Sequence, residues 1–101
     1  MADEKCLKGV LVNNNIFEDL GFDRDEALNL KVRADLMIDL RDRIQKQGWT
    51  QKEAAEFLGE TQPRISNLMN GEISRFSIDK LINLLGKIGM DVRIEVVSNA
   101  A

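Results

Sequence analysis

The sequence predicts a mainly α-helical single domain that ends in one short β-strand. Apolar residues recur three or four positions apart through residues 16–90, and helix-capping residues and glycines separate these stretches. After residue 90 the pattern changes to strict alternation. A chain of 101 residues supports one core rather than two, with roughly 60–70% of the unfolded surface buried. The expected organisation is an N-terminal segment 1–15, a helical domain 16–90, a strand 91–97 and a tail 98–101.

The N-terminal segment has the least regular pattern. Leu7 to Val12 can form a short strand, and Asn13-Asn14-Asn15 is typical of a turn or loop. The pattern leaves open whether this segment forms a strand or is disordered. Ile16 to Leu20 then resembles one helical turn that stops at Gly21.

A long helix follows, with Asp23 as its N-cap and Glu26 three residues later, as in a capping box. Gly48 ends it. Its length of about 24 residues is long for a globular helix, so a break near Lys31–Arg33 is an alternative. The apolar residues that recur along it are Ala27, Leu28, Ala34, Leu36, Met37, Leu40 and Ile44.

Three shorter helices are predicted next. Thr50 and Glu53 form a capping box for a helix that reaches Leu58, and Trp49 is placed to contact Ala54 as a hydrophobic staple. A helix over 61–70 begins near Pro63, where a missing N–H costs little. A last helix begins at Ser77 or Asp79 and ends at Gly89. Its apolar face is Ile78, Leu81, Ile82, Leu84, Leu85 and Ile88.

The strand predicted over residues 91–96 places Val92, Ile94 and Val96 on one face. A single strand is not stable alone, so this one needs a partner. Pairing with a second copy of the chain is the favoured interpretation, with these three residues in the dimer interface. The alternative is pairing with residues 7–12 of the same chain.

The composition excludes several classes of function. The chain has no histidine and only one cysteine, Cys6, which removes the usual zinc sites and the Ser-His and Cys-His catalytic pairs. No glycine-rich phosphate loop is present, so we expect neither an enzyme, nor a metal, nor a cofactor. The longest apolar runs are too short to span a bilayer or form a signal peptide, so we expect a cytoplasmic protein with no membrane partner.

The formal charge of −3 is unevenly distributed. Residues 1–30 hold three basic and seven acidic residues, a net of −4, whereas residues 41–80 hold seven basic and six acidic residues, a net of +1. The middle of the chain is only marginally basic, which is unusual for a protein that binds phosphates strongly.

The spacing over residues 51–68 is that of a helix-turn-helix, in which the second helix enters the major groove of DNA. Ala55 is small enough to let two short helices cross, and Gly59 suits a tight turn. Ile65 and Leu68 turn inward. The residues left on the outer face of the second helix are Gln62, Pro63, Ser66, Asn67 and Asn70.

The outer residues are chemically suited to reading bases. Gln and Asn bond bidentately to adenine and Arg to guanine, and Pro63 can contact a thymine methyl group. The helix N-termini at Thr50 and Thr61 present N–H groups to phosphates without added charge. The alternative is a plain helical hairpin in a small bundle, whose polar face is merely solvated.

The stretch "GWTQKEAAEFLGETQPRISNLMNGEISRFSIDKLINLLGKIGMDVRIEV" resembles the helix-turn-helix domain of the XRE (Cro/C1-type) regulators. More narrowly, it is similar to HigA-like antitoxins that pair with RelE-type ribonuclease toxins. The upstream "NIFEDLGFDRDEALNLKVRADLMIDL" also matches that subgroup. The resemblance covers about residues 15–97. Met69 departs from it, because many relatives have Glu at this position.

The resemblance implies a lambda-repressor-like fold of five helices, used as a dimer on a palindromic operator in double-stranded DNA. It also implies autorepression of an operon and a RelE-type toxin as partner. The acidic residues 1–30, with a net charge of −4, would be complementary in charge to a basic toxin. The base-contacting set expected on this basis is Gln62, Pro63, Arg64, Ser66 and Asn67. The phosphate-contacting set is Thr50, Gln51, Thr61, Arg75 and Ser77.

Overall fold

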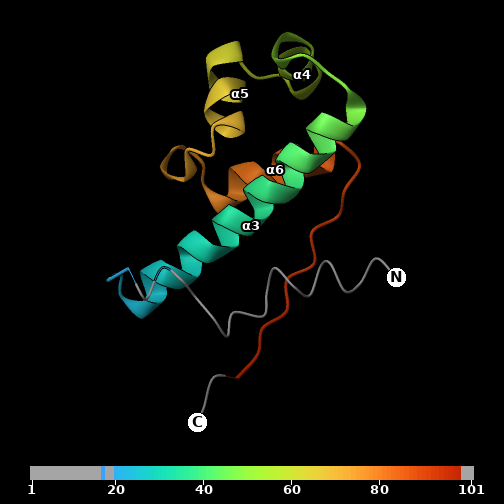
Figure 1. The fold of residues 1–101 in the computed structure, drawn as a ribbon. Helices are drawn as coiled ribbons and strands as arrows, with labels where there is room; N and C mark the ends of the chain where they lie inside the picture. The colour runs from blue at the N-terminus through green and yellow to red at the C-terminus, as the bar shows by residue number, and fades with distance from the viewer. Residues whose placement is uncertain (1–16, 18–19, 99–101) are drawn as a thin grey trace.

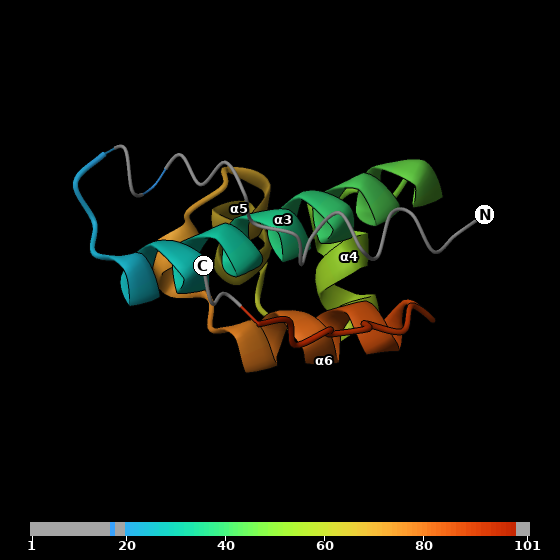
Figure 2. The same cartoon turned by 90° about the horizontal axis from the view of Figure 1, so that it is seen from below.

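The computed structural model describes residue 17 and residues 20–98 of the chain. The elements of this part are α3 (Arg24–Gln47), α4 (Gln51–Leu58), α5 (Gln62–Met69), the short 3₁₀ helix η1 (Ile73–Arg75) and α6 (Ile78–Lys87). Helices α3 and α6 run alongside one another and pack together, and α4 packs against α5 (Figure 1). Seen from below, the α4–α5 pair lies on the far side of α3 and α6 (Figure 2).

Helix α3 is continuous, so the alternative of a break near Lys31–Arg33 is wrong. The Asp23 side chain accepts a hydrogen bond from the Glu26 backbone N–H at 2.9 Å, and Gly48 ends the helix at φ 73°. Leu28 was expected on the apolar face but is 46% exposed. It follows the buried Ala27 by one residue and is therefore rotated by about 100° around the helix axis. The residues that α3 buries are Ala27, Leu30, Met37, Leu40 and Ile44.

Helix α6 begins with Ser77 as its N-cap, the first of the two predicted starts. The Ser77 hydroxyl accepts a hydrogen bond from the Lys80 backbone N–H at 3.1 Å. At the other end, Gly89 has φ 92° and the Met90 N–H donates to the Leu85 carbonyl at 3.0 Å. The bond from Met90 satisfies a carbonyl near the end of the helix, as in a Schellman motif.

The hydrophobic core lies between α3, α4, α5 and α6 and includes a residue from the loop after η1. That residue is Phe76, which is 2% exposed. Trp49, Met69 and Val92 are half-buried against the core. The largest fully buried side chains are Phe76, Leu40, Leu58, Ile65, Leu68, Leu81 and Leu84.

Two fold predictions need correction within residues 17 and 20–98. This part of the chain contains four α-helices and one 3₁₀ helix, not five α-helices, and it contains no β-strand. The segment expected to be a strand, 91–97, has no regular secondary structure. A strand needs a neighbour to pair its backbone N–H and C=O groups, and none lies beside this segment in the described part of one chain.

The predicted N-terminal strand 7–12 and the turn at Asn13–Asn15 lie outside the described residues. The helical turn predicted at 16–20 lies there in part. Among its described residues, the Phe17 carbonyl accepts a hydrogen bond from the Leu20 N–H at 3.2 Å, and Gly21 follows with φ 100°. No helix in the described part is long and apolar enough to cross a membrane.

Candidate nucleic-acid interface

The first helix of the predicted helix-turn-helix, α4, begins with the capping box that the sequence predicts. The Thr50 hydroxyl accepts a hydrogen bond from the Glu53 N–H at 3.1 Å, and the Glu53 carboxylate accepts one from the Thr50 N–H at 2.8 Å. Trp49, just before the cap, packs against the core as a staple would and also meets Phe57, with ring centroids 4.6 Å apart. The start of α4 is therefore held by both backbone capping and apolar contact.

The turn between α4 and α5 has the geometry that the spacing predicts. Gly59 adopts φ 69°, and the Glu60 N–H donates to the Ala55 carbonyl at 2.9 Å. Ala55 is 4% exposed, and Ile65 and Leu68 are fully buried. All four fixed positions thus have the roles inferred for them, and the two short helices pack directly on one another.

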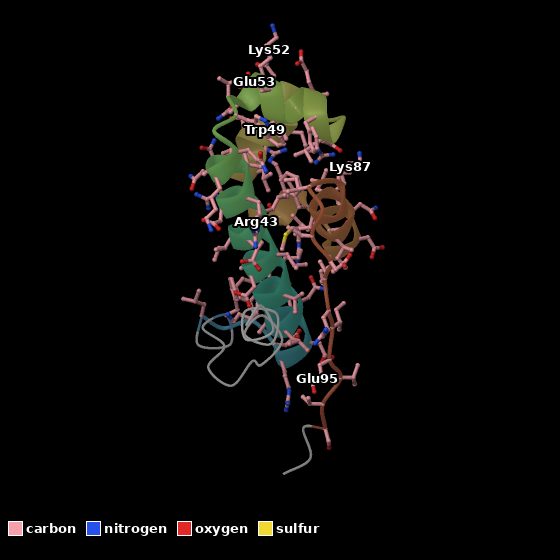
Figure 3. The ribbon with its side chains drawn as sticks, turned by 90° about the vertical axis from the view of Figure 1, so that its right-hand side faces the viewer. Arg43, Trp49, Lys52, Glu53, Lys87 and Glu95 are labelled. Atoms are coloured by element: carbon pink, nitrogen blue, oxygen red, sulfur yellow. The ribbon has the colours of Figure 1, made fainter. Side chains whose placement is uncertain are left out.

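Two lysines of α6 hold this turn, a feature that the sequence analysis missed. Lys87 Nζ donates to the Leu58 carbonyl at 2.8 Å, where α4 ends, and Lys80 forms an ion pair with Glu60. The Glu60 side chain is only 10% exposed. Figure 3 shows Lys87 on α6, next to the end of α4. Because these contacts join residues about 20 to 30 positions apart, local patterns contain no signal for them.

Helix α5 presents a polar outer face. Thr61 is its N-cap, accepting a hydrogen bond from the Arg64 N–H at 3.3 Å, and Pro63 lies in the first turn as predicted. Ile65 and Leu68 point into the core. Of the residues predicted for the outer face, Gln62, Pro63 and Asn70 are exposed, and Asn67 is half-buried. Ser66, between them, is also half-buried.

Arg64 differs from the other residues of the predicted base-contacting set. Its Nη1 donates to the Arg75 carbonyl at 3.0 Å, and its Cζ lies 5.4 Å from the centroid of the Phe76 ring. The guanidinium therefore bridges from α5 to the loop that follows it. A second arginine, Arg33 of α3, donates to the carbonyls of Ile73 at 3.2 Å and of Phe76 at 3.3 Å.

The predicted phosphate-contacting residues are all exposed. Thr50 and Gln51 lie at the start of α4, Thr61 at the start of α5, and Ser77 at the start of α6. Arg75 ends η1, and its Nε is bonded to the Glu72 carboxylate at 2.8 Å. The set therefore combines three capped helix starts, where N–H groups favour anions, with one exposed cation.

Met69, at the end of α5, is half-buried against the core. Ile44 of α3 is 3% exposed in the same core. An apolar residue at position 69 thus joins the packing between α5 and the rest of the fold, where a carboxylate would need a charged partner.

Comparisons with known proteins agree with this geometry. Residues 16–97 match the family described as a helix-turn-helix domain, and no curated protein gives a significant match. The match spans α3 to α6. In the described part of the chain, no group of three or more acidic or cysteine side chains is arranged to hold a metal ion. The chain belongs to the helix-turn-helix domain family of DNA-binding folds.

Proposed function

We propose that this protein is a sequence-specific DNA-binding transcriptional regulator that places α5 in the major groove. The observation that carries the proposal is the polar outer face of α5, which is exposed at Gln62 and Pro63 and half-buried at Ser66 and Asn67. The inner face of the same helix is fixed by Ile65 and Leu68. A helix of eight residues is not stable alone in water, so the fold holds it in place. A major groove is wide enough for such a helix.

In this proposal the outer face of α5 reads bases and the helix starts contact phosphates. Gln62 and Asn67 have the amide groups that pair bidentately with adenine, and Pro63 and Ser66 lie on the same side of the helix. The proposed phosphate contacts come from capped helix starts and from the end of η1: Thr50, Gln51, Thr61, Ser77 and Arg75. We propose the cytoplasm as the place where this transcriptional regulator acts.

The test is fluorescence anisotropy with duplex DNA from upstream of the protein's own gene. Scrambled duplex DNA is the control, and both are measured at about 50 and 200 mM salt, a range over which phosphate contacts weaken strongly. We expect tighter, salt-sensitive binding to the upstream duplex. Equal weak binding to both duplexes would refute a sequence-specific regulator.

Asn67→Ala tests the base-contacting face. We expect it to lower the operator affinity by about 1–3 kcal/mol and to relax the preference at one base pair. Asn83→Ala is the matched control, because Asn83 is an exposed asparagine on α6. Unchanged operator binding by folded Asn67→Ala protein would remove α5 from the base-reading role.

We further propose that the protein binds a palindromic operator as a homodimer, in which residues 91–97 pair as strands with a second copy. The support is the exposed alternation of this segment: Ile94 is 61% and Val96 92% exposed. Val92, the third residue assigned to the interface, is half-buried against the core of its own chain. Of the three assigned residues, Ile94 and Val96 are therefore the exposed ones, and Val97 beside them is 55% exposed. Figure 3 shows Glu95 at the end of the molecule opposite Trp49 and Lys52.

Sedimentation of the double variant Ile94→Asp, Val96→Asp tests the dimer. We expect monomers and weaker binding to a palindromic site, because two charges in the paired face repel each other. Glu95→Ala, on the other side of the alternation, is the control and should stay dimeric. A dimer that survives both Asp substitutions would contradict strand pairing.

The second candidate function is neutralisation of a RelE-type toxin by an autorepressing, HigA-like antitoxin. The specific observation is an apolar and acidic surface around the start of α3. Leu20 is 67% exposed and Leu28 46% exposed, and Asp25 and Glu26 are exposed beside them. Exposed apolar residues with acidic neighbours in the sequence suit a basic protein partner.

Co-purification with the product of a neighbouring gene for a basic protein of about 100 residues tests this role. We expect a complex that Leu20→Asp with Leu28→Asp abolishes, whereas Asn67→Ala leaves it intact. A complex unaffected by the two Asp substitutions would place the partner elsewhere, and the absence of any complex would refute the antitoxin role.

A further inference from the structure

Two arginines from different helices hold the loop of residues 72–76, which we call the η1 loop. Arg64 comes from α5 and bonds the Arg75 carbonyl at 3.0 Å. Arg33 comes from α3 and bonds the carbonyls of Ile73 and Phe76 at 3.2 and 3.3 Å. Three carbonyl acceptors of the loop, at Ile73, Arg75 and Phe76, are thus bound by charged donors, which form stronger hydrogen bonds than neutral ones.

The Arg64 side chain is engaged on two sides. Its guanidinium lies over the ring of Phe76, and Phe76 is 2% exposed in the core. Arg64 also follows Pro63 by one residue, which rotates it by about 100° around the helix axis, away from the outer face and toward the η1 loop. The Arg75 carbonyl thus takes a donor of Nη1 and the Phe76 ring covers one face of the guanidinium, so both contacts hold the side chain on the η1 loop.

We infer that Arg64 is a positioning residue, which fixes the η1 loop to the end of the recognition helix and does not read a base. This inference rests on the proposed DNA-binding function and replaces the base contact expected for Arg64. The loop carries Arg75, whose side chain is 58% exposed, and leads directly into the N-cap Ser77. Arg64 and Arg33 together place these two phosphate-contacting residues at the edge of the groove.

The inference separates affinity from sequence discrimination. Phosphate contacts set the affinity and its salt dependence but carry no sequence information, whereas base contacts set the preference for one sequence. Loss of Arg64 should therefore weaken binding to every duplex by the same factor. Loss of a base-reading residue should change the ratio between sequences instead.

The experiment measures binding of the full chain to the operator and to operators with single base-pair changes, over a range of salt concentrations. The variants are Arg64→Lys and Arg33→Lys, which keep the charge but lose the planar guanidinium. In Arg64 this group bonds a carbonyl while it lies over a ring, and in Arg33 it bonds two carbonyls. Arg43→Lys is the matched control, because Arg43 lies on α3 (Figure 3) and makes no hydrogen bond to the η1 loop. Asn67→Ala is the base-reading reference.

We expect Arg64→Lys and Arg33→Lys each to weaken binding about tenfold, the size of one charge-assisted hydrogen bond. The ratios between operators should stay unchanged, and the slope of log affinity against log salt should fall by about one phosphate contact per protomer. Arg43→Lys should behave as the wild type. If Arg64→Lys does not fold, Arg64→Gln and Arg33→Lys are measured in the same way.

Three results would overturn the inference. The first is a relaxed preference at one base pair in Arg64→Lys, as in Asn67→Ala, because Arg64 would then read that base. The second is an unchanged salt slope, which loss of folded protein alone would produce. The third is wild-type behaviour of Arg33→Lys beside a defective Arg64→Lys. A wild-type protein that binds no duplex, or all duplexes equally, would overturn the proposed function together with this inference.

Discussion

At Gly59 the backbone adopts φ 69°, a left-handed conformation that costs other residues roughly 1–2 kcal/mol. The position lies between the two helices of the helix-turn-helix and close to Lys87, whose Nζ would be 3.5 Å from an added Cβ. That distance is ordinary contact, so the conformation rather than space makes glycine the preferred residue here.

Gly59→Ala should lower the free energy of unfolding by about 1 kcal/mol because alanine resists a positive φ. The matched control is Gly86→Ala within α6, where nothing lies within 4 Å of the added Cβ. There the substitution should stabilise by about 0.5–1 kcal/mol, since alanine favours a helix more than glycine does. Urea unfolding of both variants measures the effects, and equal changes of the same sign would contradict this account.

Among the elements, α4 is bonded by side chains at both of its ends. It has eight residues, too few for a helix to be stable alone, and Thr50 and Glu53 satisfy two N–H groups at its start. The other end is bonded by Lys87. Helix α4 is thus held at both termini, and its position sets that of α5.

Thr50→Ala should lower the free energy of unfolding by about 0.5–2 kcal/mol, the usual effect of losing an N-cap hydroxyl. The measurement is thermal unfolding without DNA, so that the proposed phosphate contact of Thr50 does not contribute. Lys52→Ala, at an exposed position of the same helix (Figure 3), should change stability by less than about 0.5 kcal/mol. A Thr50→Ala effect as small as that of Lys52→Ala would show that Trp49 and core packing hold the helix without the cap.

For the molecule as a whole, the charge opposes binding to DNA without sequence preference. The net charge is −3 and residues 41–80 contribute only +1, so little attraction remains once salt screens it. Capped helix starts provide N–H groups for phosphates but add no net charge.

We expect the protein to bind scrambled duplex DNA weakly at about 200 mM salt. The expected Kd is about 10⁻⁴ M or larger, which is the weak end of the usual range for non-specific binding. The measurement is anisotropy titration, with the Glu95→Lys variant as a control for net charge, because position 95 is distant from the helix-turn-helix (Figure 3). Micromolar binding of the wild type to scrambled DNA would show that local cationic residues outweigh the net charge.

Short-range patterns predicted the helices and their ends well. The caps at Asp23, Thr50 and Ser77 form as expected, because a capping bond joins residues three positions apart. The apolar face of α3 was predicted less well: Leu30 is buried and Leu28 is exposed. The side of a helix that becomes buried depends on which other helices cover it. Where apolar residues occupy adjacent positions, the sequence does not specify which of them lies on the buried side.

The sequence alone was enough to determine the helix-turn-helix, since spacing, capping and turn chemistry all act within a few residues of one another. Only the tertiary structure decided that Arg64 bonds the η1 loop and that Phe76 is buried. The same is true of the contacts of Lys80 and Lys87 with the turn between α4 and α5. It also showed that residues 91–97 form no strand in the described part of one chain. The physical reason is the same in each case: these contacts join segments distant in sequence, and only the packing of α3, α5 and α6 brings the partners together.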